Sequence, residues 1–338
     1  MSFLLSLVIY LATYFFSVAC VYVAEKHKGL KRLMYPCAVI IPSITATFRE
    51  SGIDYPSYRS MYRWIHGSGA DYIEPFWILL NKISFSYEFC LFLAALLFCI
   101  TACTAICRLV RKDRWLAWFI FLVVCYNAFL NIMRQMLAVS IVFLGFSYLK
   151  EKKLWKYFLC VIIASLFHKA TFVMILVPIY SAFVKKIKNP EIFILPFCIA
   201  APAVIPIIKA VCLSMGIFSS YFSKPVHSSY GFLLYMLPPL FFYYLLRREC
   251  VKDSLTKWFY GLYLLVFPFQ FWGGSLAYID RYMLYFQIFI TVLVPSIIQR
   301  YDEKYKRHNL RLFYFLWFVI HFTVVYAVLN GNGIFPYR

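Results

Sequence analysis

The chain has 338 residues, of which 63% are hydrophobic, 21% are aromatic and only 14% are charged. Soluble domains are about half apolar and about a quarter charged, so this chain has too few charges to cover a soluble globule. The composition excludes a cytosolic enzyme, a secreted disulfide scaffold and a disordered protein. The 34 Lys and Arg residues outnumber the 14 acidic ones, for a net charge of +20. Such a balance suits either nucleic-acid binding or the orientation of membrane spans.

Apolar segments follow one another along almost the whole chain. A spanning helix needs about 20 apolar residues, fewer where neighbours shield it. The segments are 3–24, 33–47, 88–107, 115–130, 133–149, 155–167, 170–184, 191–213, 230–246, 258–273, 282–298 and 312–329. They predict an all-α integral membrane protein with about 12 transmembrane helices, several short or broken. The pair 155–167 and 170–184 is either a hairpin of two short helices or one broken span. The first segment lacks a basic n-region and a cleavage site, which favours a retained span.

Every second break between these segments is basic. The six basic breaks hold 24 of the 34 Lys and Arg residues, and they run over 26–32, 108–114, 150–156, 185–188, 247–257 and 300–311. Cytoplasmic loops carry an excess of Lys and Arg, so all six are expected in the cytoplasm and both termini on the extracytoplasmic side. Most of the +20 charge is then topological. With no compact basic domain outside the membrane, we expect no nucleic-acid partner.

The longest of the remaining breaks, 48–87, is too polar to span and is expected as an extracytoplasmic loop with short interfacial helices in a single polytopic domain, 1–338. Its tyrosines, which include Tyr55, Tyr58 and Tyr72, have two interpretations. They belong to the aromatic belt at the membrane interface, or they bind sugar, because an aromatic ring stacks on the apolar face of a pyranose.

Ionisable side chains at membrane depth are costly and suggest function. Arg134 follows Asn131 at a tight turn that brings two spans together, with no acidic residue adjacent in sequence. It either snorkels to head groups or pairs with a distant carboxylate, or it binds an anion, since a guanidinium matches phosphate with two parallel hydrogen bonds.

Two further polar pairs fall on the same predicted side. His168 and Lys169 interrupt about thirty apolar residues. A lone histidine is more often structural than catalytic, but two donors at one turn suggest a polar pocket. Asp280 and Arg281 are adjacent, and they either form a local ion pair or supply a second anion ligand through Arg281. None of the 11 cysteines has a CxxC or Cys/His spacing, and no Asp-x-Asp pair occurs, so no metal site is expected.

These residues, in this order, resemble the EpsG-like family of Wzy-type polysaccharide polymerases. The resemblance rests on an arginine (Arg49), GIDYPSY from Gly52, Glu74-Pro75, NIMRQ from Asn131, FHK from Phe167 and DRY from Asp280. It covers roughly 45–290. The family's FHxSA-type pattern is altered here to FHKAT, with Lys169 in place of a small or polar residue.

The resemblance implies a membrane glycosyltransferase of GT-C-like fold. Such enzymes join oligosaccharide repeat units carried on undecaprenyl diphosphate, at the outer leaflet of the bacterial inner membrane, for O-antigen, capsule or exopolysaccharide. It implies a lipid-linked oligosaccharide as substrate, no cofactor or metal, and a chain-length regulator and a flippase as partners.

The residues have expected roles in that chemistry. A diphosphate leaving group gains charge in the transition state, so cations aimed at it contribute most to catalysis. The expected diphosphate ligands are Arg49, Arg134, Arg281 and Lys169. A general base for the acceptor hydroxyl is expected among His168, Asp54 and Glu74, with His168 first. The expected sugar contacts are Tyr55, Tyr58, Tyr72, Asn131, Gln135 and Asp280.

Three other functions compete with this one. A glycan ligase would use the same chemistry but favours a larger outer loop. A flippase or transporter of lipid-linked sugar tends to show internal repeats and polar residues at the bilayer midplane, and we see no repeat. A membrane O-acyltransferase also places a histidine in an apolar stretch, but its acyl donor is usually cytoplasmic, whereas His168 is predicted on the other side.

Overall fold

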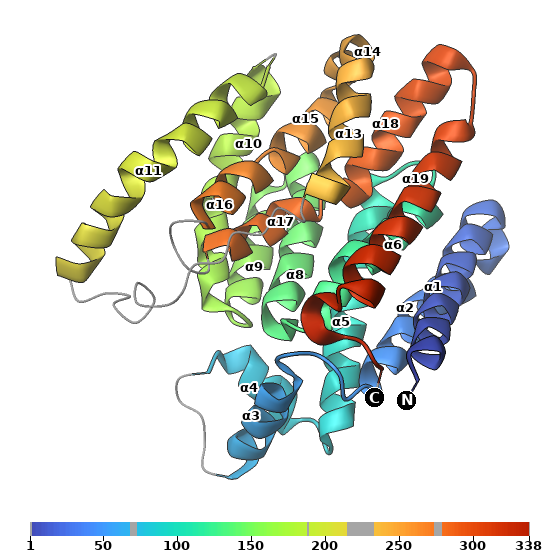
Figure 1. The fold of residues 1–338 in the computed structure, drawn as a ribbon, viewed down its shortest axis with the longest axis vertical. Coiled ribbons are helices and arrows are strands. Elements are labelled where there is room, and N and C mark those ends of the chain that lie inside the picture. Colours follow the sequence, from blue (N-terminus) through green and yellow to red (C-terminus); the bar gives the residue numbers. More distant parts are fainter. Residues whose placement is uncertain (1, 68–72, 188, 215–232, 274–278, 338) are drawn as a thin grey trace. The chain divides into compact units, whose positions relative to one another are not determined.

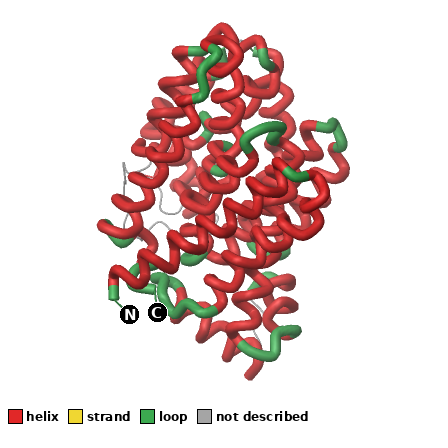
Figure 2. Tube along the Cα trace, turned by 90° about the vertical axis from the view of Figure 1, so that its right-hand side faces the viewer, coloured by secondary structure: helices red, strands yellow, loops and turns green. Residues whose placement is uncertain are grey.

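A computed structural model of the chain describes residues 2–67, 73–187, 189–214, 233–273 and 279–337. These described residues form helices joined by loops and turns, and they contain no β-strand (Figure 2). The all-α prediction is therefore confirmed. The chain divides into two compact units, which are Met1–Val177 together with Tyr301–Arg338, and Pro178–Arg300.

The first unit consists of two stretches of the chain, whose helices can be followed in Figure 1. They are α1 (Phe3–Lys26), α2 (Lys31–Thr47), α3 (Tyr55–Gly67), α4 (Pro75–Lys82), α5 (Tyr87–Leu109), α6 (Arg114–Phe121), α7 (Asn127–Phe129), α8 (Met133–Lys150), α9 (Leu154–Ser165), η3 (Lys169–Leu176), α19 (Asn309–His321) and η6 (Gly331–Gly333), with π-helical turns η2 (Leu122–Tyr126) and η5 (Phe322–Val328). Helices α1, α2, α5, α8 and α9 pack each against the next, and α6 packs on α1. Helices α3 and α4 both lie within the predicted polar loop 48–87.

The second unit contains α10 (Val177–Lys186), α11 (Glu191–Ser214), α13 (Leu233–Leu245), α14 (Arg247–Lys252), α15 (Ser254–Tyr263), α16 (Val266–Gly273), η4 (Ile279–Met283), α17 (Leu284–Gln287) and most of α18 (Ile290–Tyr305). Within it, α16 packs against α11 and η4, and α15 packs against α14 and α17.

Within the described residues, all twelve predicted apolar segments fall mainly on helices, but few of these helices are long. Three are long and apolar enough to cross a membrane, namely Phe3–Lys26, Tyr87–Leu109 and Asn309–Val328. Two bent pairs, Glu191–Ala200 with Val204–Ser214 and Ile279–Gln287 with Ile290–Tyr305, raise the number to five if each pair is one span. The protein thus has three to five candidate spans among its described residues. The count of twelve and the orientation stay predictions.

A series of buried hydrogen bonds joins α1, α2 and α6. It depends on a proline inside α2. Pro42 lies inside α2 and has no backbone N–H, so the carbonyl of Ala38 loses its usual helical donor. Ser17 of α1 donates to that carbonyl at 2.6 Å, and the Trp118 indole donates to the Ser17 hydroxyl at 2.7 Å. Polar groups in an apolar interior must be paired, and here the pairing also fixes the register of three helices.

Close approach of α8 and α9 depends on a glycine. A Cβ at Gly145 would lie 3.1 Å from the Cβ of Cys160, which is tighter than ordinary packing. Small residues at such crossings let membrane helices pack closely. The chain turns back after α9, and η3 packs against that helix. The part of the predicted pair that lies in the first unit, 155–167 and 170–176, is therefore a hairpin of two short helical pieces, whereas residues 178–184 belong to the second unit.

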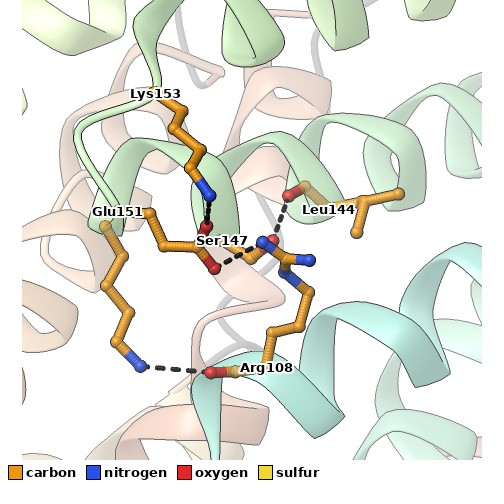
Figure 3. Close-up of polar contacts among 6 residues, drawn as sticks. Arg108, Leu144, Ser147, Glu151 and Lys153 are labelled. Atoms are coloured by element: carbon orange, nitrogen blue, oxygen red, sulfur yellow. Dashed lines mark hydrogen bonds and ion pairs between the residues drawn. The ribbon is translucent and has the colours of Figure 1, made fainter.

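The basic breaks of the first unit gather at one of its ends, which we call the basic end (residues 26–32, 108–114 and 150–156). Glu151 accepts hydrogen bonds from Arg108 and Lys153, and Lys150 donates to the carbonyl of Arg108, so the ends of α5 and α8 are joined (Figure 3). The Lys153 hydrogen bond is the main reason that the pKa of Glu151 is lowered.

The starts of α2, α6 and α19 meet at the same end. Arg114 lies 3.5 Å from the Tyr35 hydroxyl, and Arg311 donates two hydrogen bonds to Asp113, at 2.7 and 2.9 Å. Helices α3 and α4 lie at the opposite end of this unit (Figure 1). Within the first unit, the basic breaks and the polar segment 48–87 thus lie at opposite ends.

Candidate active site

Glu74 lies where three segments of the first unit meet. Pro75 begins α4, which makes Glu74 its N-cap residue, but the carboxylate makes no capping hydrogen bond to its own helix. It accepts instead from the Arg134 guanidinium at 2.6 Å and from the backbone N–H of Lys169 at 3.2 Å. The side chain is only 8% exposed. A buried carboxylate with two donors is a fixed negative centre around which other polar groups are arranged.

Arg134 reaches this centre from the first turn of α8. Helix N-termini carry partial positive charge and unsatisfied N–H groups, and the backbone N–H of Arg134 donates to the Tyr58 hydroxyl at 3.3 Å. The guanidinium side chain is 25% exposed. Of the two interpretations of Arg134, pairing with a distant carboxylate is observed. Its open side and the helix N-terminus still allow an anion to be bound there.

His168 and Lys169 reach the same carboxylate from the turn after α9. His168 Nδ1 lies 3.8 Å from Glu74 Oε1, and its side chain is partly exposed. The backbone N–H of Phe76 donates to the Leu166 carbonyl at 3.0 Å, and the rings of Phe76 and Phe167 pack edge to face. These contacts fix the turn against α4. The Lys169 side chain itself is exposed.

The loop before α3 is joined to the turn before α8. The backbone N–H of Asp54 donates to the Asn131 side-chain carbonyl at 2.9 Å. Asn131 therefore connects two backbone segments in this arrangement. Asp54 is half-buried, and Gln135, in the first turn of α8, is buried. Asp54 lies four residues before Tyr58 in the sequence, and Gln135 directly follows Arg134. The described contacts of Asp54 and Gln135 do not include Glu74.

Tyr55 and Tyr58 are buried, so their rings are not exposed on the surface for a sugar to stack on. The Tyr55 ring packs edge to face on Tyr87, and the Tyr58 ring packs edge to face on Trp77. Burial raises the pKa of Tyr58, so its hydroxyl stays protonated at neutral pH. In this arrangement the two tyrosines position α3 and the start of α8. Tyr72 lies outside the described residues.

Arg49 lies deep in the first unit, beyond the end of α2. It is 1% exposed, and it donates from Nη1 to the Ser51 carbonyl at 2.6 Å. Its guanidinium lies 5.9 Å from the centre of the Tyr55 ring. Burial lowers the pKa of Arg49, yet a guanidinium stays charged in proteins. A ligand approaching the Glu74 cluster would not reach this charge without movement of the covering residues.

Asp280 and Arg281 belong to the second unit. They lie in η4, where Asp280 is half-buried and Arg281 is exposed. A Cβ at Gly273, the last residue of α16, would lie 2.6 Å from the Asp280 Cβ, so α16 and η4 approach closely there. The η4 turn that carries Asp280 therefore packs against α16 within the second unit.

The structure brings together Glu74, Arg134, His168 and the backbone of Lys169, with Tyr58, Asp54 and Asn131 beside them. Sequence reasoning placed these residues on one side of the protein but missed the contact of Glu74 with Arg134. It also missed residues 330–337, which fold onto the loop before α3. No pattern in the sequence marks either feature.

The cluster combines a buried carboxylate, a guanidinium at a helix N-terminus, an imidazole and a nearby exposed ammonium. A carboxylate beside an imidazole stabilises the imidazolium that forms when the ring takes up a proton. A guanidinium and a helix N-terminus together attract an anion such as a phosphate. The arrangement can therefore support proton transfer from a bound hydroxyl next to a bound anion.

Comparison with known proteins identifies one family. The model of the EpsG family matches residues 32–338, nearly the whole chain. No curated protein and no solved structure matches the chain.

Proposed function

Since this chain belongs to the EpsG family, whose members are polysaccharide polymerase-like proteins, we propose that it polymerises oligosaccharide repeat units carried on undecaprenyl diphosphate. The observation that carries the proposal is the cluster of Glu74, Arg134 and His168 at the end of the first unit opposite the basic end. Basic loops are retained in the cytoplasm, so the cluster would face the outer leaflet.

The proposed reaction is a glycosyl transfer. A hydroxyl of one repeat unit attacks the anomeric carbon of the growing chain, and a new glycosidic C–O bond forms. The C–O bond to the diphosphate breaks, and the undecaprenyl diphosphate leaves with the electron pair. His168 takes up the proton of the attacking hydroxyl, and Glu74, 3.8 Å from its Nδ1, stabilises the resulting imidazolium.

Arg134 has a distinct role in this scheme. Its guanidinium has five N–H donors, of which Nη1 serves Glu74. The remaining donors on its open side, with the N-terminus of α8, would bind the diphosphate as negative charge grows on it. The exposed Lys169 ammonium would add to the same field. Asn131 and Gln135 are candidate sugar contacts beside Arg134. Arg281 and Asp280 belong to the second unit, and their roles as anion ligand and sugar contact stay predictions from the sequence.

The wider setting follows from this reaction. The product would be O-antigen, capsule or exopolysaccharide in the bacterial inner membrane. A flippase must supply the lipid-linked unit to the outer leaflet, and a chain-length regulator is the expected second partner. The transfer as written needs no cofactor.

The direct test is incubation of the purified protein, in nanodiscs, with a lipid-linked repeat unit. We expect a ladder of products that differ by one repeat unit each. A single transfer to an unrelated acceptor would indicate a ligase instead. Substrate that stays intact but crosses the bilayer of a vesicle would indicate a flippase.

The orientation can be tested by cysteine labelling. Ser60, in α3, and Lys152, after α8, are both exposed. We expect a membrane-impermeant maleimide added to spheroplasts to label Ser60→Cys, and to label Lys152→Cys only after permeabilisation. The parent protein, with its own 11 cysteines, measures the background. Labelling of position 152 but not of position 60 in intact spheroplasts would reverse the orientation and contradict the outer-leaflet site.

The role of His168 predicts a specific defect. We expect His168→Ala to lower turnover by about 10²–10⁴-fold, the usual contribution of a general base, with inhibition by inorganic diphosphate unchanged. His66→Ala is the matched control, because His66 is exposed and bonds only the Tyr62 carbonyl of its own helix among the described contacts. Unchanged turnover in His168→Ala would transfer the role to Asp54 or remove the need for a base.

A further inference from the structure

Residues 330–337 fold back over one end of the first unit, and we call them the C-terminal strap. The strap is anchored to two helices. The Tyr337 backbone N–H donates to the Ser6 hydroxyl at 2.9 Å, and the Tyr337 hydroxyl donates to the Thr45 carbonyl at 2.9 Å. Tyr10 donates to the Ile334 carbonyl at 3.1 Å. Contacts with α1 and α2 thus hold the strap against the end that carries the Glu74 cluster.

The strap pairs with the loop before α3 through two backbone hydrogen bonds. Gly52 N–H donates to the Gly333 carbonyl at 2.9 Å, and Ile53 N–H donates to the Asn332 carbonyl at 3.3 Å. Asn332 also donates from its side chain to the Asn127 carbonyl at 3.3 Å. The loop and the strap are therefore joined through their backbones, and Asn332 joins the strap to the end of the α6–α7 segment.

Glycine is required on both sides of this pairing. Gly52 has φ of 115° and Gly333 has φ of 63°, which L side chains rarely adopt. A Cβ at Gly333 would lie 2.9 Å from Ile53 Cγ1, and a Cβ at Gly52 would lie 2.9 Å from the Leu130 carbonyl oxygen. At these two glycines the strap approaches the loop, and the loop approaches the turn before α8, too closely for a side chain to fit between them.

The same loop leads directly to Arg134. Beyond Ile53, the Asp54 N–H is held by the Asn131 side chain at 2.9 Å. One turn further, the Tyr58 hydroxyl accepts the backbone N–H of Arg134 at 3.3 Å. A continuous series of hydrogen bonds therefore runs from the strap, through residues 52–58, to the first turn of α8.

Arg49 lies beneath this loop and depends on it. Its Nη1 donates to the Ser51 carbonyl and would be 3.0 Å from a Cβ at Gly52. Its Nε and Nη2 have no hydrogen-bond partner within the part of the chain that the structure describes. A buried cation is costly, so the covering loop needs other contacts to stay in place, and the strap supplies them.

We propose that the C-terminal strap is a positioning element of the active site, which sets the orientation of Arg134 by holding residues 52–58 against the start of α8. The proposal rests on the proposed function in one respect, the binding of diphosphate by Arg134. In this proposal the strap acts through residues 52–58 and not by contact with the substrate.

The first test is hydrogen–deuterium exchange of the full chain carrying Gly333→Ala. Alanine at this position would have a strained backbone, because φ is positive there, and its Cβ would lie too close to the Ile53 side chain. We expect amide exchange in residues 50–58 and also in 130–136 to rise by about tenfold, as for the loss of one or two local hydrogen bonds. Gly67→Ala is the matched control, since a Cβ at Gly67 meets nothing within 4 Å. Faster exchange confined to 50–55 would overturn the proposal.

The second test measures binding of inorganic diphosphate to the purified protein by titration calorimetry. We expect Gly333→Ala to weaken it by about tenfold, the loss expected when a charge-assisted hydrogen bond is misaligned. A lower melting temperature with unchanged affinity would make the strap merely structural and overturn the proposal. Parent protein that binds no diphosphate would contradict the proposed role of Arg134, while the exchange experiment would still decide the strap.

Asn332→Gly serves if Gly333→Ala does not fold. It keeps the backbone freedom needed at φ of 64° and removes only the side-chain hydrogen bond to Asn127. We expect the same two changes at smaller amplitude. Exchange and affinity equal to those of the parent protein would overturn the proposal.

Discussion

Replacing Arg134 with lysine is expected to lower polymerisation by about 10²–10³-fold, the usual cost of losing a group that stabilises transition-state charge. Lysine keeps the positive charge and can still pair with Glu74. It cannot serve Glu74 and a diphosphate at once, because an ammonium is a single point charge whereas a guanidinium is a planar fork. The measurement is the length and amount of polymer formed from a lipid-linked repeat unit.

The control for this variant is Arg63→Lys. Arg63 is exposed on α3, within the polar segment 48–87, and an exposed charge contributes little. We expect wild-type polymer from it and normal membrane insertion from both variants. Near-wild-type polymer from Arg134→Lys would remove Arg134 from diphosphate binding.

Glu74→Gln is expected to affect stability and activity together. The carboxylate is 8% exposed and accepts from both the Arg134 guanidinium and the Lys169 N–H. Neutralising it leaves the guanidinium without its counter-charge. The loss for a fully buried pair is about 3–5 kcal/mol. Because Arg134 is a quarter exposed, we expect about 2–3 kcal/mol, since solvent screens part of the interaction.

Thermal unfolding in one detergent, with polymerisation measured beside it, tests this expectation. Glu50→Gln is the matched control, since Glu50 pairs with Arg59 at 3.7 Å with both side chains well exposed, and such pairs are worth less than about 1 kcal/mol. Equal melting temperatures for Glu74→Gln and Glu50→Gln would show that the Glu74 pair does not organise the site.

The two variants test different parts of one arrangement. Arg134→Lys retains the pair and removes the fork, whereas Glu74→Gln retains the fork and removes its anchor. If Glu74 acts only by holding Arg134 and His168, its loss should resemble the combined loss of both. The effects of substitutions at contacting residues of one network are not additive. The variant that combines Arg134→Lys with Glu74→Gln should therefore be little less active than Glu74→Gln alone.

The position of the helices and of the polar breaks was predictable from the sequence, for a simple reason. In lipid every backbone polar group must be satisfied within a helix, so runs of apolar residues read directly as helices. Lys and Arg cluster at one end of the spans. In the first unit Arg108, Arg114 and Lys150 join helix ends at one end, and α4, which begins directly after Glu74, lies at the other. That Arg134 and His168 lie at the same end also followed from that alternation, whereas the side of the membrane that this end faces stays a prediction.

Which side chains touch was not predictable in the same way. Glu74 contacts a residue 60 positions away and a backbone N–H 95 positions away, and such distances along the chain are closed only by the packing of α4, α8 and α9. The position of Arg49 was not predictable either. The sequence suggested that its guanidinium binds diphosphate, whereas the fold buries it at 1% exposure.

By itself the sequence determined that this is a helical membrane protein of the EpsG family, because apolar segments, charge alternation and the short motifs that carry the family resemblance are local properties of the chain. Only the tertiary structure decided that Glu74 joins Arg134 to the His168 turn, that Tyr55 and Tyr58 pack inward, and that residues 330–337 cover the loop at Gly52. The physical reason is that these outcomes depend on close approach between distant backbones, which requires glycine at Gly52 and Gly333 and paired polar groups wherever the interior excludes water.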